Sequence, residues 1–332
     1  MDDSHYRESE IQALIVLIEL SDPIETPNNT HYCFYPKNIP QAQTYFRRFA
    51  LDLSEGFDAL LRRELAYKHG GSWQLTTRGW HAARHARTRR PPIWYWYKDF
   101  YLAIEHSPAF SRYCERVYGK DLSQHGFSNV DELDWMLSLI TLDETTHVLD
   151  IGCGNGKIAE YISDTTSALV LGIDYLPEAI AQAQSRTVNK HDRLRFQVRN
   201  LDELDALEKR FHVIVSIDTI FFGQDLTTTL ATWKRLLKPD GAMMIFCGED
   251  LSIAVTLNQL VCTVYDRSRE HHQHLQLKRK VAKHLKKAFE AEGHLFLWEN
   301  IMAESLAETI GYDSATCSRP RYLYHVWIPS VN

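Results

Sequence analysis

Seven residues, Asp-Ile-Gly-Cys-Gly-Asn-Gly from Asp150 to Gly156, limit the possible folds of this chain more than any other segment. They follow an apolar run over residues 146–150 that predicts a strand, and a helical pattern follows them. Glycines permit positive φ angles and let a ligand approach the backbone closely. A helix that begins just after such a turn presents free N–H groups and the positive end of its dipole. The segment therefore predicts a strand, a ligand-binding turn and a helix in succession.

Strand and helix patterns alternate along the chain after this turn. Alternation at this spacing predicts an α/β protein with a parallel, doubly wound sheet and helices on both faces. The predicted strands are 146–150, 168–174, 194–198, 211–218, 242–246 and 322–328, and the predicted helices include 177–187 and 227–237.

An acid follows the turn at the distance expected for a nucleotide-binding site. Asp174 ends the second strand, 174 − 154 = 20 residues after Gly154, where it can accept hydrogen bonds from ribose hydroxyls. The dinucleotide pattern Gly-x-Gly-x-x-Gly fits less well. Starting at Gly152 it requires glycine where the chain has Lys157, and starting at Gly154 it meets Ala159. A dinucleotide enzyme is therefore the weaker of two alternatives.

The Asp-x-Gly-x-Gly-x-Gly spacing resembles the first motif of class I S-adenosylmethionine-dependent methyltransferases. Residues 172–174, Gly-Ile-Asp, resemble the ribose-binding acid of that family, and residues 236–241, Leu-Leu-Lys-Pro-Asp-Gly, resemble its helix-turn-strand signature. The resemblance covers roughly residues 110–330. It implies a Rossmann-like fold with a seven-stranded, mostly parallel sheet and an antiparallel last strand.

The same resemblance implies a cofactor and the residues that bind it. The cofactor is S-adenosyl-L-methionine, the product is S-adenosyl-L-homocysteine, and no metal is expected. Asp202 is an alternative to Asn200 for the contact with adenine, and Cys153 occupies a variable position of the turn. The implied cofactor-binding residues are Asp150, Gly152, Cys153, Gly154, Gly156, Asp174, Tyr175, Asn200, Leu201, Tyr118 and Gln124.

The segment before the turn is a candidate lid. Residues 124–127, Gln-His-Gly-Phe, are similar to a His-Gly-Phe element that lies near the methionine end of the cofactor in several small-molecule methyltransferases. His125 is therefore a candidate catalytic residue. The alternative is a helix that packs on the sheet and carries a surface histidine.

A second candidate group follows the fourth strand, at the edge where open α/β sheets bind ligands. Asp218 is a candidate catalytic or substrate-contacting residue. Phe221 and Phe222 are candidate walls of a substrate pocket, or else core residues beneath the next helix.

These features predict a methyltransferase that transfers a methyl group to a small molecule by direct in-line displacement. Such a reaction mainly requires alignment and exclusion of water. A base is needed only if the acceptor loses a proton. Carbon, nitrogen and oxygen acceptors all stay open, as does an RNA or protein substrate.

The first part of the chain has a different pattern. Arg-Arg-Pro-Pro at 89–92 marks a boundary, since two prolines fit neither a helix interior nor a central strand. The predicted parts are a winged-helix-like domain over 1–90, connecting and lid helices over 91–145, and the methyltransferase domain over 146–332. Helices over 10–20, 40–49 and 53–67, a strand over 72–76 and a helix from residue 80 resemble a winged helix-turn-helix. That resemblance implies a homodimer formed through this domain, or a lid.

Six basic residues occur between positions 78 and 98 with no acid among them, next to the aromatic run 94–97. They allow an alternative function, a regulatory protein that binds nucleic acid through the winged helix and senses a metabolite. The overall charge of 37 − 43 = −6 argues against this, because nucleic-acid binding needs a basic footprint. Nucleic acid is therefore an unlikely partner, and an interface between domains is preferred.

The remaining clusters suggest no further chemistry. His271 and His274 share a helix face, but no recognisable metal ligand set accompanies them. The basic residues over 267–287 predict a solvated helix face or a rim that attracts an anionic substrate. No apolar run approaches the ~20 residues that span a bilayer. Six scattered cysteines and a polar, acidic start predict a cytoplasmic protein without a membrane partner.

Overall fold

The structure is a computed structural model that describes residues 6–26, 29–40, 52–90, 94–126, 128–201, 204–205, 207, 211–223, 225–310 and 320–329. Contacts divide the chain into two units, Met1–Phe100 and Tyr101–Asn332. Among the described helices, none has the length and apolar character needed to cross a membrane.

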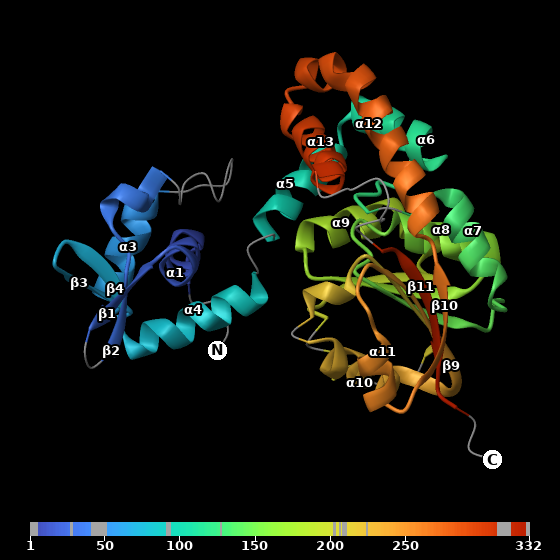
Figure 1. Cartoon of the computed structure of the whole chain (residues 1–332), viewed down its shortest axis with the longest axis horizontal. Helices are drawn as coiled ribbons and strands as arrows, with labels where there is room; N and C mark the ends of the chain where they lie inside the picture. The colour runs from blue at the N-terminus through green and yellow to red at the C-terminus, as the bar shows by residue number, and fades with distance from the viewer. Residues whose placement is uncertain are drawn as a thin grey trace. The chain divides into compact units, whose positions relative to one another are not determined.

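A seven-stranded sheet forms the centre of the second unit (Figure 1). Strand β11 runs antiparallel to its neighbours β9 and β10, and the other strands run in one direction. The strand order is β10-β11-β9-β8-β5-β6-β7. In chain order the strands are β5 (His147–Ile151), β6 (Leu169–Asp174), β7 (Leu194–Val198), β8 (Phe211–Ile217), β9 (Leu237–Cys247), β10 (Val261–Asp266) and β11 (Tyr322–Trp327).

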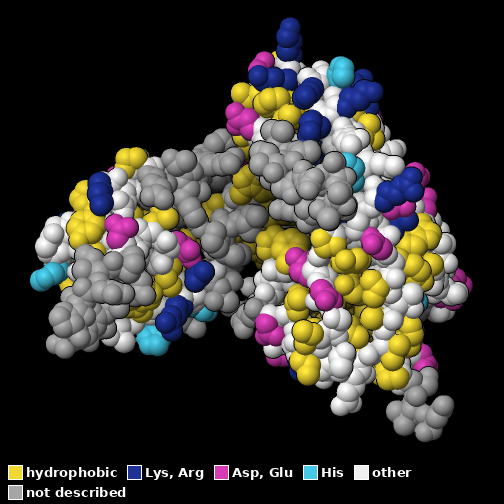
Figure 2. All heavy atoms as spheres, viewed as in Figure 1, with side chains coloured by type: hydrophobic (Ala, Val, Ile, Leu, Met, Phe, Trp, Pro, Cys, Tyr) yellow, Lys and Arg dark blue, Asp and Glu magenta, His cyan; other side chains and the backbone are white. Residues whose placement is uncertain are grey.

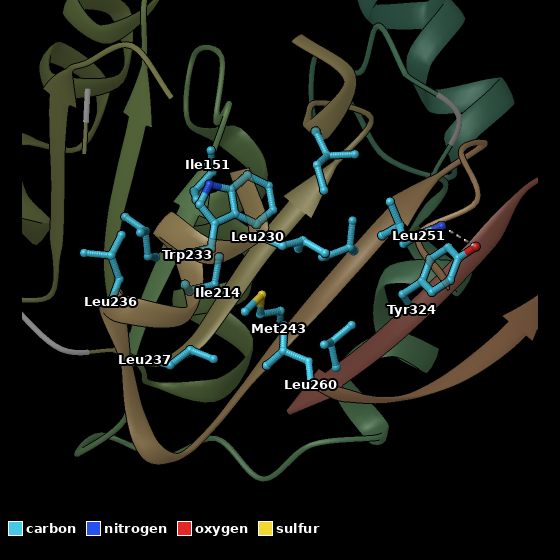
Figure 3. Close-up of a cluster of buried hydrophobic side chains, with 14 of the residues drawn as sticks. Ile151, Ile214, Leu230, Trp233, Leu236, Leu237, Met243, Leu251, Leu260 and Tyr324 are labelled. Carbon is cyan, nitrogen blue, oxygen red and sulfur yellow. Dashed lines mark hydrogen bonds between the residues drawn. The ribbon is translucent and has the colours of Figure 1, made fainter. Parts of the chain in front are cut away.

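Helices cover both faces of this sheet. On one face, Trp233 and Leu230 pack on Ile214 and Met243 of the strands, as Figure 3 shows. On the other face, Met136 and Ile162 belong to a second buried cluster. The helices of the first face are α10 (Leu226–Leu236) and α11 (Ser252–Leu257), and those of the second are α7 (Val130–Ser138), α8 (Lys157–Thr166) and α9 (Pro177–Arg186).

A group of further helices lies at the edge where the parallel strands end. Helix α12 begins directly after the carboxyl end of β10, and it packs against both α6 and α13 (Figure 1). Ligands of open α/β sheets bind beyond this edge. The helices of this group are α6 (Pro108–Tyr118), α12 (Ser268–Ala291) and α13 (Leu295–Ile310), and helix α5 (Trp94–Ile104) precedes α6 in the chain.

The predicted α/β fold with an antiparallel last strand is confirmed, and two details differ. Strand β10 was not predicted, because most of its side chains are exposed and it lacks an apolar face. Strand β9 begins at Leu237 rather than at 242, since it continues through the turn-like Lys-Pro-Asp-Gly.

The first unit contains three described α-helices before α5 and two hairpins. Thr76 caps α4 by accepting a hydrogen bond from the Gly79 N–H at 3.0 Å, as its position before the helix predicts. The prediction of a helix over 53–67 is wrong at its end, because α3 stops at Arg62 and a strand follows. The predicted helix over 40–49 falls almost entirely outside the described residues. The elements are α1 (Glu8–Glu19), β1 (Asp22–Thr26), β2 (Asn29–Cys33), α3 (Leu53–Arg62), β3 (Ala66–His69), β4 (Ser72–Leu75) and α4 (Thr77–Arg89).

The division between the two units falls within α5. The winged-helix assignment, the three-part division of the chain and the homodimer stay predictions.

Candidate functional site

The glycine turn joins β5 to α8 with three residues in the left-handed region. Gly152, Gly154 and Gly156 have φ angles of +77°, +54° and +75°. A Cβ on Gly154 would lie 2.0 Å from the Tyr101 hydroxyl oxygen, and one on Gly152 would lie 2.3 Å from the Thr219 hydroxyl oxygen. Conformation and space therefore both require glycine at these positions.

Asp174, at the end of β6, is bonded to this turn. Its Oδ2 accepts a hydrogen bond from the Gly154 N–H at 2.9 Å, and its Oδ1 accepts one from the Leu176 N–H at 2.9 Å. Burial raises the pKa of Asp174 to about 6, although these backbone donors act in the opposite direction. The structure thus brings together the turn and the acid that the sequence predicts.

Asp150 forms a second buried carboxyl group beside the first. The residue is 3% exposed, and its Oδ2 has no hydrogen-bond partner among the described residues. Burial and the charge of Asp174 together raise the pKa of Asp150 to about 7. A buried acceptor of this kind is costly unless a donor binds it, so the pair fits a ligand that carries hydrogen-bond donors or positive charge.

The other predicted cofactor residues lie around the same edge. Cys153 is buried, and burial with the charge of Asp150 raises the pKa of its thiol well above the usual value. Cys153 therefore stays a neutral thiol, which agrees with a side chain that fills space in the turn. Tyr175 follows Asp174, and Asn200 and Leu201 follow the carboxyl end of β7, all three half-buried. Asp202 and Phe127 lie outside the described residues.

The candidate lid is tied to the helices at this edge. The Tyr118 hydroxyl donates to the carbonyl oxygen of Gly126 at 2.9 Å. Gln124 is buried, and its Oε1 accepts a hydrogen bond from the Leu122 N–H at 3.0 Å. His125 is not a surface histidine: its Nε2 lies 3.0 Å from Oδ1 of Asn300 and 3.1 Å from Oε1 of Glu304, both on α13.

Asp218 lies next to the lid and is held by a buried arginine. Its backbone adopts a φ of +53°, directly after β8. Arg321, which precedes β11, contacts Oδ1 at 2.5 Å and Oδ2 at 3.3 Å, and also donates to the Ser128 hydroxyl at 2.8 Å. A Cβ on Gly126 would lie 2.6 Å from Asp218 Oδ2. The ion pair therefore joins the end of β8, the start of β11 and the lid.

The two aromatic residues after Asp218 form a short 3-10 turn, residues Ile220–Phe222, with ring centroids 4.5 Å apart. Phe221 is 46% exposed and Phe222 is half-buried. The alternative that both are core residues is therefore wrong.

Helix α12 has two different faces, and only one of them was predicted. The exposed basic residues of α12 are, as expected, Lys280, Lys283, Lys286 and Lys287. Basic side chains gather at the top of the view in Figure 2. The expectation of a solvated face is wrong for Lys278, which is 1% exposed and lies 3.2 Å from Oε2 of Glu304. His271 and His274 are buried on the same face.

The burial of Lys278 and its pairing with Glu304 were not predicted from the sequence, for a physical reason. A buried lysine is costly without a partner, and its partner lies on another helix, which local pattern does not reveal. The i, i+3, i+7 spacing of His271, His274 and Lys278 was the available signal. Within the described part of the chain, no group of three or more His, Cys, Asp or Glu residues could hold a metal ion.

Comparison with known proteins agrees with this geometry. Residues 148–241 match the family model of a methyltransferase domain. Phosphoethanolamine N-methyltransferase 1 of Triticum aestivum is 32% identical over 132 residues, which are 40% of this chain and 26% of that protein. Ubiquinone biosynthesis O-methyltransferase of Bradyrhizobium diazoefficiens is 31% identical over 98 residues, 30% of this chain and 38% of that protein. The chain thus spans less than half the length of these curated relatives.

Solved structures share the fold at low identity. Phosphoethanolamine N-methyltransferase 2 of Haemonchus contortus, in complex with phosphomonomethylethanolamine and S-adenosylhomocysteine, has a TM-score of 0.57 at 14% identity, covering 99% of this chain and 76% of that chain. The cyclopropane synthase MmaA2 of Mycobacterium tuberculosis has a TM-score of 0.55 at 14% identity, covering 69% and 97%. The fold is thus the Rossmann-like methyltransferase fold.

Proposed function

We propose that this protein is an S-adenosylmethionine-dependent methyltransferase that acts on a small-molecule acceptor. The observation that carries the proposal is the buried carboxylate pair, Asp150 and Asp174, at the glycine turn. The curated relatives are named as methyltransferases of small molecules, and the Haemonchus structure contains S-adenosylhomocysteine. A [4+2]-cyclase shares the fold with a TM-score of 0.54 at 13% identity, so the fold alone does not define the reaction.

The residues at the turn fit this cofactor. The two oxygens of Asp174 accept the N–H groups of Gly154 and Leu176, and a carboxylate has further lone pairs that can accept from a ribose hydroxyl. The second oxygen of Asp150 can accept from an ammonium group. Asn200 or Leu201 would contact adenine, and Tyr118 and Gln124 would close the methionine end. S-adenosylmethionine, when bound, supplies a methyl group on a positively charged sulfur.

The remaining residues would position the acceptor for in-line transfer. Phe221 and Phe222 offer apolar surface beyond β8, where acceptors of this fold class bind. Asp218, whose carboxylate is held by Arg321, would contact the acceptor. His125 would take the proton of an acceptor that loses one. Phosphoethanolamine is the first acceptor to test, since relatives of this chain are named for it.

Binding of S-adenosylhomocysteine should strengthen as the pH rises from about 5 to 8. The raised pKa values, about 6 for Asp174 and about 7 for Asp150, mean that the free protein holds protons there below those values. Ribose hydroxyls and an ammonium group favour the ionised forms, so binding releases protons. Below about pH 6, the lower of the two pKa values, linkage predicts that the affinity falls about tenfold per pH unit for each proton released.

Isothermal titration with S-adenosylhomocysteine at several pH values measures this dependence. We expect micromolar dissociation constants at pH 8. A well-folded protein that binds neither S-adenosylmethionine nor its product at any of these pH values would refute the proposed function.

The alternative function, binding of nucleic acid, depends on the basic residues between positions 78 and 98. Two of its arginines are paired with acids of α1, since Arg87 lies 2.5 Å from Glu19 and Arg90 contacts Glu8. Paired arginines contribute less to a basic footprint. The protein should therefore elute from heparin at low salt, and replacing Arg84, Arg87 and Arg90 by alanine should change its elution little. Strong retention that the triple replacement abolishes would favour the regulatory nucleic-acid-binding protein.

A further inference from the structure

A chain of polar contacts links α12 and α13 to the candidate lid. His125 Nε2 lies 3.1 Å from Glu304 Oε1, and Glu304 Oε2 lies 3.2 Å from Lys278 Nζ. The side chains of His125 and Glu304 are each 20% exposed, and that of Lys278 is 1% exposed. Both oxygens of one carboxylate are thus used, one by a histidine and the other by a lysine.

The contacts fix the chemical state of Glu304. Burial acts to raise the pKa of Glu304, but His125 and Lys278 outweigh it, and the pKa is lowered from its ordinary value. An ionised carboxylate only accepts hydrogen bonds. The histidine nitrogen that faces Glu304 must therefore carry the proton, and Oδ1 of Asn300, 3.0 Å away, accepts from the same nitrogen.

We infer that Glu304 is a positioning residue that fixes the orientation and tautomer of His125, with Lys278 holding the carboxylate in place. This inference rests on the proposed function. With Nε2 donating to Glu304, Nδ1 is the nitrogen of His125 that would take the proton of the acceptor. A base oriented by a carboxylate is a recurrent catalytic arrangement.

The inference names a class of acceptor, one whose nucleophilic nitrogen or oxygen carries a proton. During transfer the acceptor atom bonds to the methyl carbon, the carbon–sulfur bond breaks, and its electrons stay on sulfur. The acceptor's proton moves to Nδ1 of His125. The resulting imidazolium is stabilised by Glu304, and its proton later passes to water.

Nuclear magnetic resonance of the full chain with 15N-labelled histidine tests the contact without turnover. The Nε2–H of His125, assigned by its loss in His125→Gln, should give a downfield proton resonance, as expected for a proton held by a carboxylate. Glu304→Gln should remove this resonance or move it upfield. The matched control is Glu299→Gln, an exposed acid on the same helix, which should leave it unchanged. A resonance that is absent from the wild type, or unchanged by Glu304→Gln, overturns the inference.

Kinetics test the role, with phosphoethanolamine as the probe acceptor. Glu304→Gln should lower kcat about 100-fold or more, while KM and the dissociation constant of S-adenosylhomocysteine change less than about threefold. If Glu304→Gln loses the His125 resonance but keeps the kcat of the wild type, Glu304 is not a positioning residue for catalysis. If Glu304→Gln does not fold, because Lys278 loses its counter-charge, Glu304→Asp keeps the charge and withdraws the oxygen from His125.

The two proposals fail in different ways. Wild-type protein that does not bind S-adenosylhomocysteine contradicts the proposed function, and the resonance still decides whether Glu304 orients His125.

Discussion

Replacing Asp174 by alanine should weaken the binding of S-adenosylhomocysteine more than about tenfold. The change removes an acceptor for the ribose hydroxyls and leaves the buried N–H groups of Gly154 and Leu176 without their partner. The turn would also lose the contact that holds it against the end of β6. Isothermal titration at pH 8 measures the effect.

Two variants separate this explanation from a general loss of stability. Asp174→Asn preserves the shape and one acceptor, so its affinity should fall between those of the wild type and the alanine variant. Asp192→Ala removes an exposed acid from the same unit and should leave the affinity unchanged. Equal affinities for Asp174→Ala and the wild type would show that the ribose is bound elsewhere.

Replacing Arg321 by methionine should lower the free energy of unfolding by about 3–5 kcal/mol, the usual result of breaking a buried ion pair. Side-chain exposure is 3% for Arg321 and 13% for Asp218, so the remaining carboxylate would stay buried without its counter-charge. Urea unfolding of the full chain, followed by tryptophan fluorescence, measures the change.

The matched control is an exposed pair of the same chemistry. Arg235 and Asp205 also lie 2.5 Å apart, but their side chains are 61% and 74% exposed. Arg235→Met should cost less than about 1 kcal/mol. The double variant Arg321→Met with Asp218→Asn should recover much of the loss, because it removes the stranded charge. Similar costs for Arg321→Met and Arg235→Met would mean that the buried pair is not a stabilising feature.

The arrangement of the proposed cofactor site could be predicted from the sequence, and the contacts of the proposed acceptor site could not. Asp150 and Asp174 lie on two consecutive strands, and Gly154 lies in the turn that follows the first of them, so chain order largely determines their proximity. The partners of His125 and Asp218 are Glu304 and Arg321, which follow them after 304 − 125 = 179 and 321 − 218 = 103 residues. Only the packing of α13 and the pairing of β11 bring these groups together.

The same difference between local sequence pattern and long-range packing explains where the prediction of the fold was wrong. Most of the parallel strands are recognisable because nearly all of their side chains are buried and apolar, whereas β7 alternates buried Leu194 and Phe196 with exposed residues. Strand β10 has mostly exposed side chains, so its structure depends on hydrogen bonding to β11 rather than on its own pattern. Lys278 resembles its exposed neighbours in sequence and differs only in the surroundings that other helices provide.

The position of β11 has a consequence for biosynthesis. Although β11 follows β10 in the chain by more than fifty residues, it lies between β9 and β10 in the sheet. On a ribosome, domains form from the N-terminal end onwards, so β10 emerges before the strand that joins it to the sheet. Arg321 arrives with β11, and until then Asp218 has no guanidinium to hold it. The turn at residues 152–156, which we propose binds the cofactor, therefore emerges early, whereas the side of the site that we propose binds the acceptor is completed only after residues 321–327 have left the exit tunnel.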